Sequence, residues 1–160
     1  MISRRLTKDE RALEGLPLQL MIIALVLSIG LPIVYNSISG YDSSRMMQEM
    51  EEQAVSISEK ARQVYLYGEG NSDVIEIELQ DGIFHSVEFF ELDNESVVGQ
   101  IRLAITGGSE DRHLMPDFPL FLEEAPLRLD EGEHRLSVEC RSGNRADMDE
   151  EGLYVEITKV

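Results

Sequence analysis

Hydrophobic positions run without interruption through the first part of the chain. Residues 15–41 contain no charged side chain, and residues 20–29 read LMIIALVLSI. The hydrocarbon core of a bilayer needs about 20 such residues in a helix. A soluble helix that is apolar on every side would need more surrounding protein than a chain of 160 residues can supply. We therefore expect one transmembrane helix, which Gly30 and Pro32 bend rather than end.

A helical period follows the apolar segment. Apolar residues recur at spacings of three and four and so share one helix face. This face consists of Met46, Met50, Ala54, Ile57, Ala61 and Val64. Residues 42–44 could cap a separate second helix, or one helix could run from the membrane to about Tyr67 with a bend near residues 39–40. In both cases Gly68 and Gly70 are expected to end it.

Beyond the helix the hydrophobic period changes to two, which is typical of strands. The alternating stretches are residues 74–79, 83–92, 97–106, 127–129, 134–141 and 153–158. Turns are expected at residues 80–82, 106–108, 130–132 and 142–144. About six to eight short strands favour a small antiparallel β-sandwich. The expected fold is therefore α+β, with a long N-terminal transmembrane or filament helix followed by that sandwich.

Charge is distributed unevenly along the chain. The first 15 residues carry a net charge of +1, with Arg4, Arg5, Lys8 and Arg11 as the basic residues, whereas the part from Asp42 onward carries −18. Basic residues before the span place the N-terminus in the cytoplasm and the acidic domain outside the cell. A domain of this charge repels phosphate backbones, so we expect no nucleic-acid partner.

Residues 11–20 read RALEGLPLQL, a charged leader ending in glycine directly before the apolar run. This stretch resembles the class III signal peptide of archaeal type IV pilin-like proteins. The resemblance implies that a membrane-embedded prepilin peptidase cuts between Gly15 and Leu16. It also implies a leader over residues 1–15, an apolar then amphipathic helix over residues 16–67, and an extracellular domain over residues 68–160. The helix would serve first as a membrane anchor and later as the packed core of a filament or pseudopilus.

Two features differ from the usual pattern of that family. The leader commonly has Lys or Arg directly before the glycine, where this chain has Glu14. Major pilins and archaellins tend to have unbroken apolar cores, so the interruption at Gly30 and Pro32 favours a minor pilin or pseudopilin. An ordinary secretory signal peptide is the competing interpretation, but its apolar region is usually about 7–15 residues long. Residues 37–39 also fit its cleavage site poorly.

Three functions follow from these patterns. The first is a structural or minor subunit of an archaeal pilus-like surface filament or pseudopilus, assembled with other pilin-like subunits through the N-terminal helix. The second is an uncleaved single-pass membrane protein whose sandwich binds a cell-envelope partner. A tethered enzyme ranks last, because the sequence has no phosphate loop, zinc motif or nucleophile elbow. We accordingly expect no cofactor.

The helix face has two possible uses as well. It could extend the contact with identical helices in a filament, or it could pack against the chain's own sandwich. Residues 113–122, which include two prolines, are similarly open to core packing or to a subunit contact.

The remaining reactive side chains favour structural roles. Cys140 alternates with Leu136 and Val138, which predicts a buried strand residue rather than a nucleophile. His85, His113 and His134 lie on separate segments without the spacing of metal ligands. Residues 147–152 are rich in oxygen ligands but lack the spacing of a calcium loop, so a solvated turn is expected there.

Asn94 begins an Asn-Glu-Ser sequon. The expected topology exposes it on the outer face, which makes it an N-glycosylation candidate.

Overall fold

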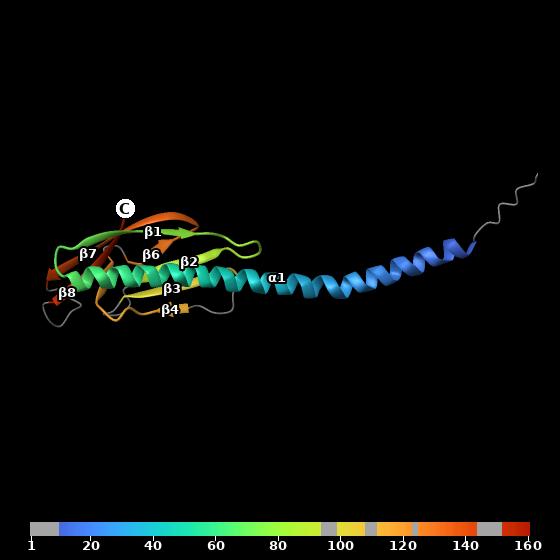
Figure 1. Ribbon diagram of the computed structural model, residues 1–160, viewed down its shortest axis with the longest axis horizontal. Coiled ribbons are helices and arrows are strands. Elements are labelled where there is room, and N and C mark those ends of the chain that lie inside the picture. The colour runs from blue at the N-terminus through green and yellow to red at the C-terminus, as the bar shows by residue number, and fades with distance from the viewer. Residues whose placement is uncertain (1–9, 94–98, 108–111, 123–124, 144–151) are drawn as a thin grey trace, which may run out of the picture. The chain divides into compact units, whose positions relative to one another are not determined.

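The computed structural model describes residues 10–93, 99–107, 112–122, 125–143 and 152–160, with side chains from Pro17 onward. The chain forms two compact units, Met1–Ile38 and Ser39–Val160. Helix α1 (Glu10–Tyr67) is 58 residues long and contains both Pro17 and Pro32 (Figure 1). Residues 42–44 therefore start no second helix, and the expectation that Pro32 does not end the helix is confirmed.

Two glycines stop α1 where the sequence predicted. Gly68 and Gly70 have φ angles of 86° and 82°, in the left-handed region that favours glycine. The side-chain amide of Asn71 donates to the carbonyl oxygens of Tyr67 and Gly68 at 2.9 Å each. These bonds satisfy carbonyl groups that the end of a helix otherwise leaves without a donor.

Two four-stranded sheets follow the helix. One has the order β1-β7-β8-β5, with β1 (Ser72–Leu79), β7 (Gly132–Gly143), β8 (Gly152–Lys159) and β5 (Leu120–Leu122). The other has the order β4-β3-β2-β6, with β4 (Arg112–Leu114), β3 (Gln100–Ile105), β2 (Val87–Asp93) and β6 (Leu127–Leu129). The α+β class and the paired sheets are thus confirmed.

One pairing differs from the antiparallel prediction. Strand β5 runs parallel to β8, with Leu120 opposite Val155 and Leu122 opposite Ile157. All three residues of β5 are buried. A parallel partner needs a long connection, which the chain provides because β6 and β7 lie between β5 and β8 in sequence.

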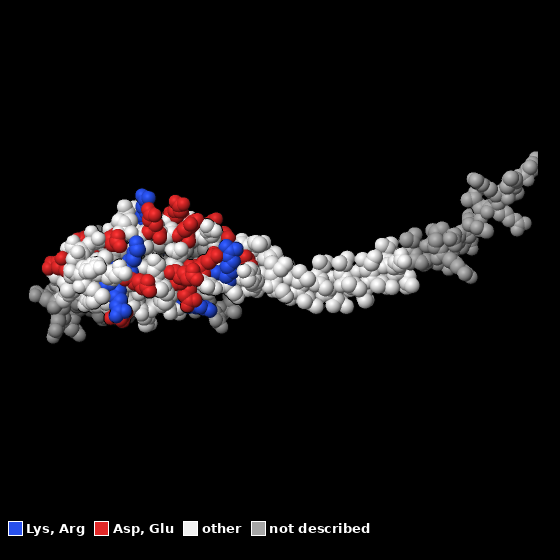
Figure 2. Space-filling model, viewed as in Figure 1, with Lys and Arg blue, Asp and Glu red and all other residues white. Residues whose placement is uncertain are grey.

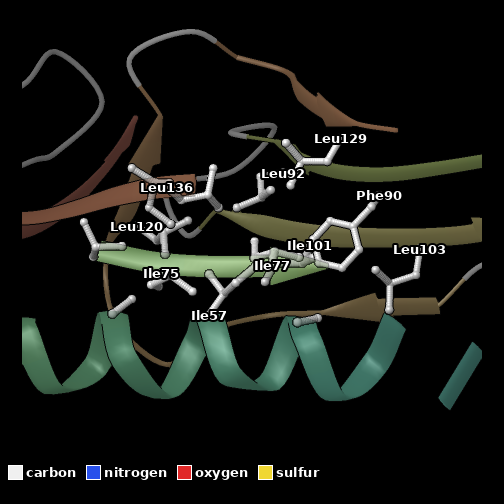
Figure 3. Packing of buried hydrophobic residues seen from close by; sticks show 14 of the residues in the cluster. Ile57, Ile75, Ile77, Phe90, Leu92, Ile101, Leu103, Leu120, Leu129 and Leu136 are labelled. Atoms are coloured by element: carbon white, nitrogen blue, oxygen red, sulfur yellow. The ribbon is translucent and has the colours of Figure 1, made fainter. Parts of the chain in front are cut away.

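The second half of α1 belongs to the same core as the sheets. The six residues of its apolar face are at most 4% exposed and join one hydrophobic cluster with residues of both sheets. In Figure 3 Ile57 of α1 lies against the side chains of β1, among them Ile75 and Ile77. The helix face therefore packs against the chain's own sheets, which decides between the two uses that the sequence left open.

The segment 113–122 also contributes to the core. Phe118, Leu120 and Phe121 are at most 4% exposed, whereas Met115 is 70% exposed. The ring of Phe118 stacks on Tyr65 of α1 with 5.7 Å between centroids. Core packing is confirmed for most apolar residues of this segment, whereas His113, Met115 and Asp117 are exposed.

Three local predictions were wrong. Residues 83–86 were expected in a strand, but β2 begins only at Val87. Ser142 and Gly143 were expected in a turn, but they extend β7, where Gly143 pairs with Gly152 of β8. The short strands β4 and β5 were not predicted, because their sequences RHL and LFL do not alternate between polar and apolar residues as that of β6 does.

Cys140 is fully buried in β7, as its alternation predicted. Burial raises the pKa of its thiol, because the thiolate would lose its hydration there. A thiol kept protonated in this way is a packing residue rather than a nucleophile.

Candidate functional site

The apolar half of α1 is the largest exposed hydrophobic surface in the part of the chain that the structure describes. Its large side chains from Leu18 to Tyr41 are between 45% and 72% exposed. Acidic and basic side chains appear over the sheet-containing unit in Figure 2, and the segment 17–41 shows none. Solvent-exposed apolar surface of this extent marks a contact with lipid or with other protein.

The segment meets the physical requirements of a membrane span. It contains a window of mean hydropathy 2.3, of which 0% is buried within the chain. Roughly 25 helical residues rise about 37 Å at about 1.5 Å each, enough for a hydrocarbon core of about 30 Å. Among the described residues it is the one candidate membrane helix, which supports a single-pass membrane protein.

Two serine hydroxyls inside the span are hydrogen-bonded within the helix. The Ser28 hydroxyl donates to the carbonyl of Leu25 at 2.8 Å, and the Ser37 hydroxyl donates to the carbonyl of Ile33 at 2.8 Å. Bonds of this kind remove the cost of placing a hydroxyl in hydrocarbon. The two serines are therefore compatible with a lipid environment.

The predicted cleavage site lies in the first turns of α1. Gly15 and Leu16 are helical in backbone, and nothing in the structure tests whether the bond between them is cut. Pro17 follows directly and has no amide hydrogen to donate to the carbonyl of Leu13, which weakens the helix around this bond.

Two other predicted features fall outside the described residues. These are the glycosylation candidate Asn94 and the acidic turn at residues 147–151.

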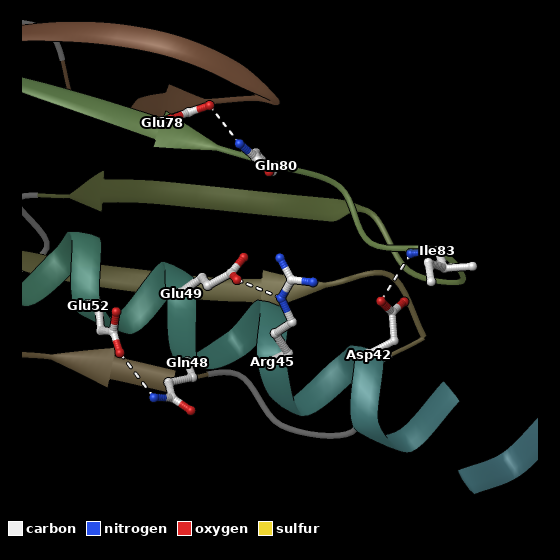
Figure 4. Close-up of polar contacts among 8 residues, drawn as sticks. All are labelled: Asp42, Arg45, Gln48, Glu49, Glu52, Glu78, Gln80 and Ile83. Carbon is white, nitrogen blue, oxygen red and sulfur yellow. Dashed lines mark hydrogen bonds and ion pairs between the residues drawn. The ribbon is translucent and has the colours of Figure 1, made fainter. Parts of the chain in front are cut away.

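Asp42, directly after the apolar segment, holds a loop of the domain to α1. Its carboxylate accepts hydrogen bonds from the backbone N–H groups of Ile83 at 3.0 Å and Phe84 at 2.8 Å (Figure 4). These two bonds lower the pKa of Asp42 below its usual value, against the opposing effect of its burial. The residue is only 6% exposed, so the ionised carboxylate is a structural link between the helix and the loop.

A histidine strengthens the same link. The Nε2 of His85 lies 3.0 Å from the hydroxyl of Ser39, and its Nδ1 lies 2.8 Å from the carbonyl oxygen of Thr106. The ring thus joins α1, the loop after β1 and the end of β3. Its role in this structure is to hold three segments together.

Gly82 permits the close approach of that loop. A Cβ atom at this position would lie 2.5 Å and 2.7 Å from the carboxylate oxygens of Asp42 and 2.6 Å from the sulfur of Met46. Such distances are far below van der Waals contact. Any other residue there would have to move the side-chain ends of Asp42 and Met46.

The other histidines do not form a shared site with His85. His134 lies in β7, where its Nε2 is 2.7 Å from the carbonyl oxygen of Asp130, and His113 lies in β4. Within the described ranges no three His, Cys, Asp or Glu side chains are grouped as a metal site would require.

One depression on the described surface has a volume of about 520 Å³ and lies between α1, β1, β7 and the end of β8. The ion pair between Arg135 and Glu76, with 2.9 Å between its atoms, lies at its wall, and both side chains are about 70% exposed. Ligand pockets are enclosed and mostly apolar. This polar, open depression has neither property.

No family model matches the chain, and no curated protein or solved structure matches it.

The link between Asp42 and the loop is the feature that the sequence did not reveal. The sequence around Asp42 indicates only a possible helix cap. The partners of its carboxylate lie 41 and 42 residues away in the chain. The sequence gives one hint, because Asp81-Gly82 interrupts the alternation just before Ile83. A broken alternation shows where a loop begins but not what it binds.

Proposed function

We propose that this chain is a structural or minor subunit of an archaeal type IV pilus-like surface filament or pseudopilus. In this proposal a prepilin peptidase removes residues 1–15, and the mature subunit assembles through the apolar part of α1. The observation that carries the proposal is the fully exposed apolar surface of residues 17–41 on a helix that continues into a compact acidic domain. In this proposal the domain has a structural role.

The burial pattern of α1 supports different contacts for its two parts. The face from Met46 to Val64 is covered by the chain's own sheets. Residues 17–41 remain without cover from their own chain. A helix that is apolar all round needs lipid or several similar helices around it. A membrane-anchored precursor and a helical bundle supply these two environments in turn.

The orientation in this proposal follows from charge. Arg4, Arg5, Lys8 and Arg11 precede the span, and the acidic domain follows it. The positive-inside rule then places the domain on the outer side of the membrane. Protease added to intact cells should remove the domain and leave the N-terminal peptide protected.

Glu14 favours a second candidate, an uncleaved single-pass protein whose domain binds a cell-envelope partner. It places a negative charge directly before Gly15, where the resembling leaders commonly carry a positive one. In this case α1 stays in the membrane and no filament forms.

The mass of the N-terminal peptide from protein isolated from its native membrane separates the two candidates. A mature chain beginning at Leu16 supports the first, and a chain beginning at Met1 supports the second. The filament claim needs a further result, recovery of the chain in sheared surface filaments. A cleaved chain that remains monomeric in the membrane would refute assembly while retaining processing.

A pair of glycine variants makes the cleavage test specific. Gly15→Val should abolish processing because the peptidase of the resembling family usually cuts after glycine. Gly30→Val is the matched control, since a Cβ atom at Gly30 meets nothing within 4 Å. The control should be processed like the native chain.

A further inference from the structure

The loop after β1 contacts the turn of α1 at which the apolar segment ends. Residues 15–41 carry no charge, and Asp42 is the first charged residue after them. The loop is bonded to this turn of α1 through Asp42 to the backbone of Ile83 and Phe84, and through Ser39 to His85. If residues 17–41 span a membrane, the outer lipid interface lies beside this loop.

The tip of the loop presents an aliphatic side chain to its surroundings. Ile83 is 79% exposed, more than any other large hydrophobic residue in the described part of the chain. Figure 4 shows it at the outer end of the loop, directed away from the body of the domain. Tyr41, on the neighbouring turn of α1, is 72% exposed. Aromatic residues at this position are typical of membrane–water interfaces.

The carboxylates near the tip are turned toward the backbone of the loop. Both oxygens of Asp42 accept backbone N–H groups, and Asp81 accepts the N–H of Val87 at 2.8 Å. The tip itself, residues 82–86, contains no acidic residue. An otherwise strongly acidic domain therefore has a tip without carboxylates beside the end of the apolar segment.

We propose that this loop is a second membrane contact, in which Ile83 enters the outer lipid interface beside the end of the span. The occupant is the bilayer surface rather than a second copy of the chain, because the loop is fixed to the turn that follows the apolar segment. The contact would hold the domain against the membrane before any assembly. It depends on anchoring through residues 17–41 and not on cleavage or filament formation.

A single tryptophan can test this contact directly. The chain contains no tryptophan, so a substituted one is the only such fluorophore. The full-length Ile83→Trp variant is reconstituted in phosphatidylcholine vesicles with and without brominated acyl chains, which quench tryptophan on contact. We expect emission at shorter wavelength than that of a hydrated tryptophan and strong quenching by the brominated lipid.

Two matched variants give the upper and lower limits of quenching by the brominated lipid. Val26→Trp lies within the apolar segment and should be quenched most strongly. Leu66→Trp, at a residue 71% exposed near the end of α1, should be unquenched and emit as a hydrated side chain. About 24 helical residues separate Leu66 from Asp42, a rise of about 36 Å.

A second substitution tests whether the loop must be held by Asp42. Gly82→Ala in the Ile83→Trp chain introduces a Cβ atom 2.5 Å from the Asp42 carboxylate, so the carboxylate that accepts the N–H groups of Ile83 and Phe84 must shift relative to the loop. Quenching of the substituted tryptophan should then fall. Gly143→Ala is the control, because its Cβ atom would meet Tyr154 at an ordinary 3.9 Å, and quenching should be unchanged.

Each result bears on the proposal. Unquenched Ile83→Trp beside quenched Val26→Trp would overturn the lipid contact and retain the anchor. A wavelength shift that grows with protein-to-lipid ratio, without quenching by brominated lipid, would show a second copy over the loop and also overturn it. Unquenched Val26→Trp would remove the anchor on which the proposal depends. The N-terminal mass and filament assays test the proposed function separately.

Discussion

The two halves of α1 differ in what covers their apolar side chains. Residues 17–41 are apolar on all sides and are exposed within the chain, whereas the half after Asp42 shows one apolar face and buries it against its own sheets. The polar residues of the second half remain outside, where Arg45 and Glu49 form an exposed ion pair at 2.7 Å. One continuous helix thus has no cover from its own chain along its first half and an internal partner along its second.

This difference separates anchoring from folding. Substitutions in the second half should act on the stability of the domain, and substitutions in the first half should act on membrane integration. Tyr65 and Tyr154 each pack against a phenylalanine in the domain, at 5.7 Å and 5.4 Å between centroids, so near-ultraviolet circular dichroism reports the unfolding of that unit.

The largest expected effect is that of Ile57→Ala. Ile57 is 0% exposed and lies in the core between α1 and β1, so its truncation leaves a cavity as well as lost burial. We expect the free energy of unfolding to fall by about 4 kcal/mol, within the range of about 2–5 kcal/mol for such sites. Urea titration of the detergent-solubilised full chain measures this change.

Val55→Ala is the matched control for Ile57→Ala. Val55 is 39% exposed on the same helix, so the change should stay within about 0.5 kcal/mol. Membrane integration should be native in both variants. Equal stability losses at the two positions would contradict burial of one helix face.

The next largest effect is that of Leu25→Arg in the first half. A charged side chain at the centre of a span costs about 3 kcal/mol of insertion free energy. We expect much less of the Leu25→Arg chain to remain in the membrane after alkaline extraction. The Leu25→Met chain should remain there to the same extent as the native chain. Domain stability should be unchanged, and a drop there would contradict the separation of the two halves.

The smallest expected effect is confined to acid pH and concerns Asp42, where the two halves meet. Backbone hydrogen bonds hold its pKa below the ordinary value, so its ionised form stabilises the folded state above its unfolded pKa of about 3.9. This stability is lost as pH falls through the lower, folded pKa. Asp42→Asn should therefore flatten the acid limb of stability against pH. Parallel curves for the two proteins would exclude this role.

The helix and the longer strands could be predicted from the sequence because each carries its own period. The spacing from Met46 to Val64 identified the buried face, and the alternation around Cys140 identified β7. The end of α1 was predicted from Gly68 and Gly70 for the same local reason. These features depend on neighbours within a few positions along the chain.

The features that escaped prediction depend on distant residues. Residues 83–86 alternate like a strand, yet Asp42 takes two of their N–H groups and Gly82 donates to the carbonyl of His85 at 2.9 Å. Strand β5 exists because β8 provides a parallel partner for three buried residues. Of the candidate site, the sequence located the span but not the loop fixed beside its end.

The strand order sets a sequence of events for a chain that is threaded outward from its N-terminus. The sheet containing β2, β3, β4 and β6 is built from residues 87–129, so its strands can pair soon after they emerge. Strand β1 must wait for β7, which pairs Ile75 with Leu136. Until then the apolar face of the second half of α1 is not covered by the sheet that contains β1 and β7. Completion of the domain therefore requires β7 and β8, and a chain arrested before them would expose the apolar surface of α1 and β1 to aggregation.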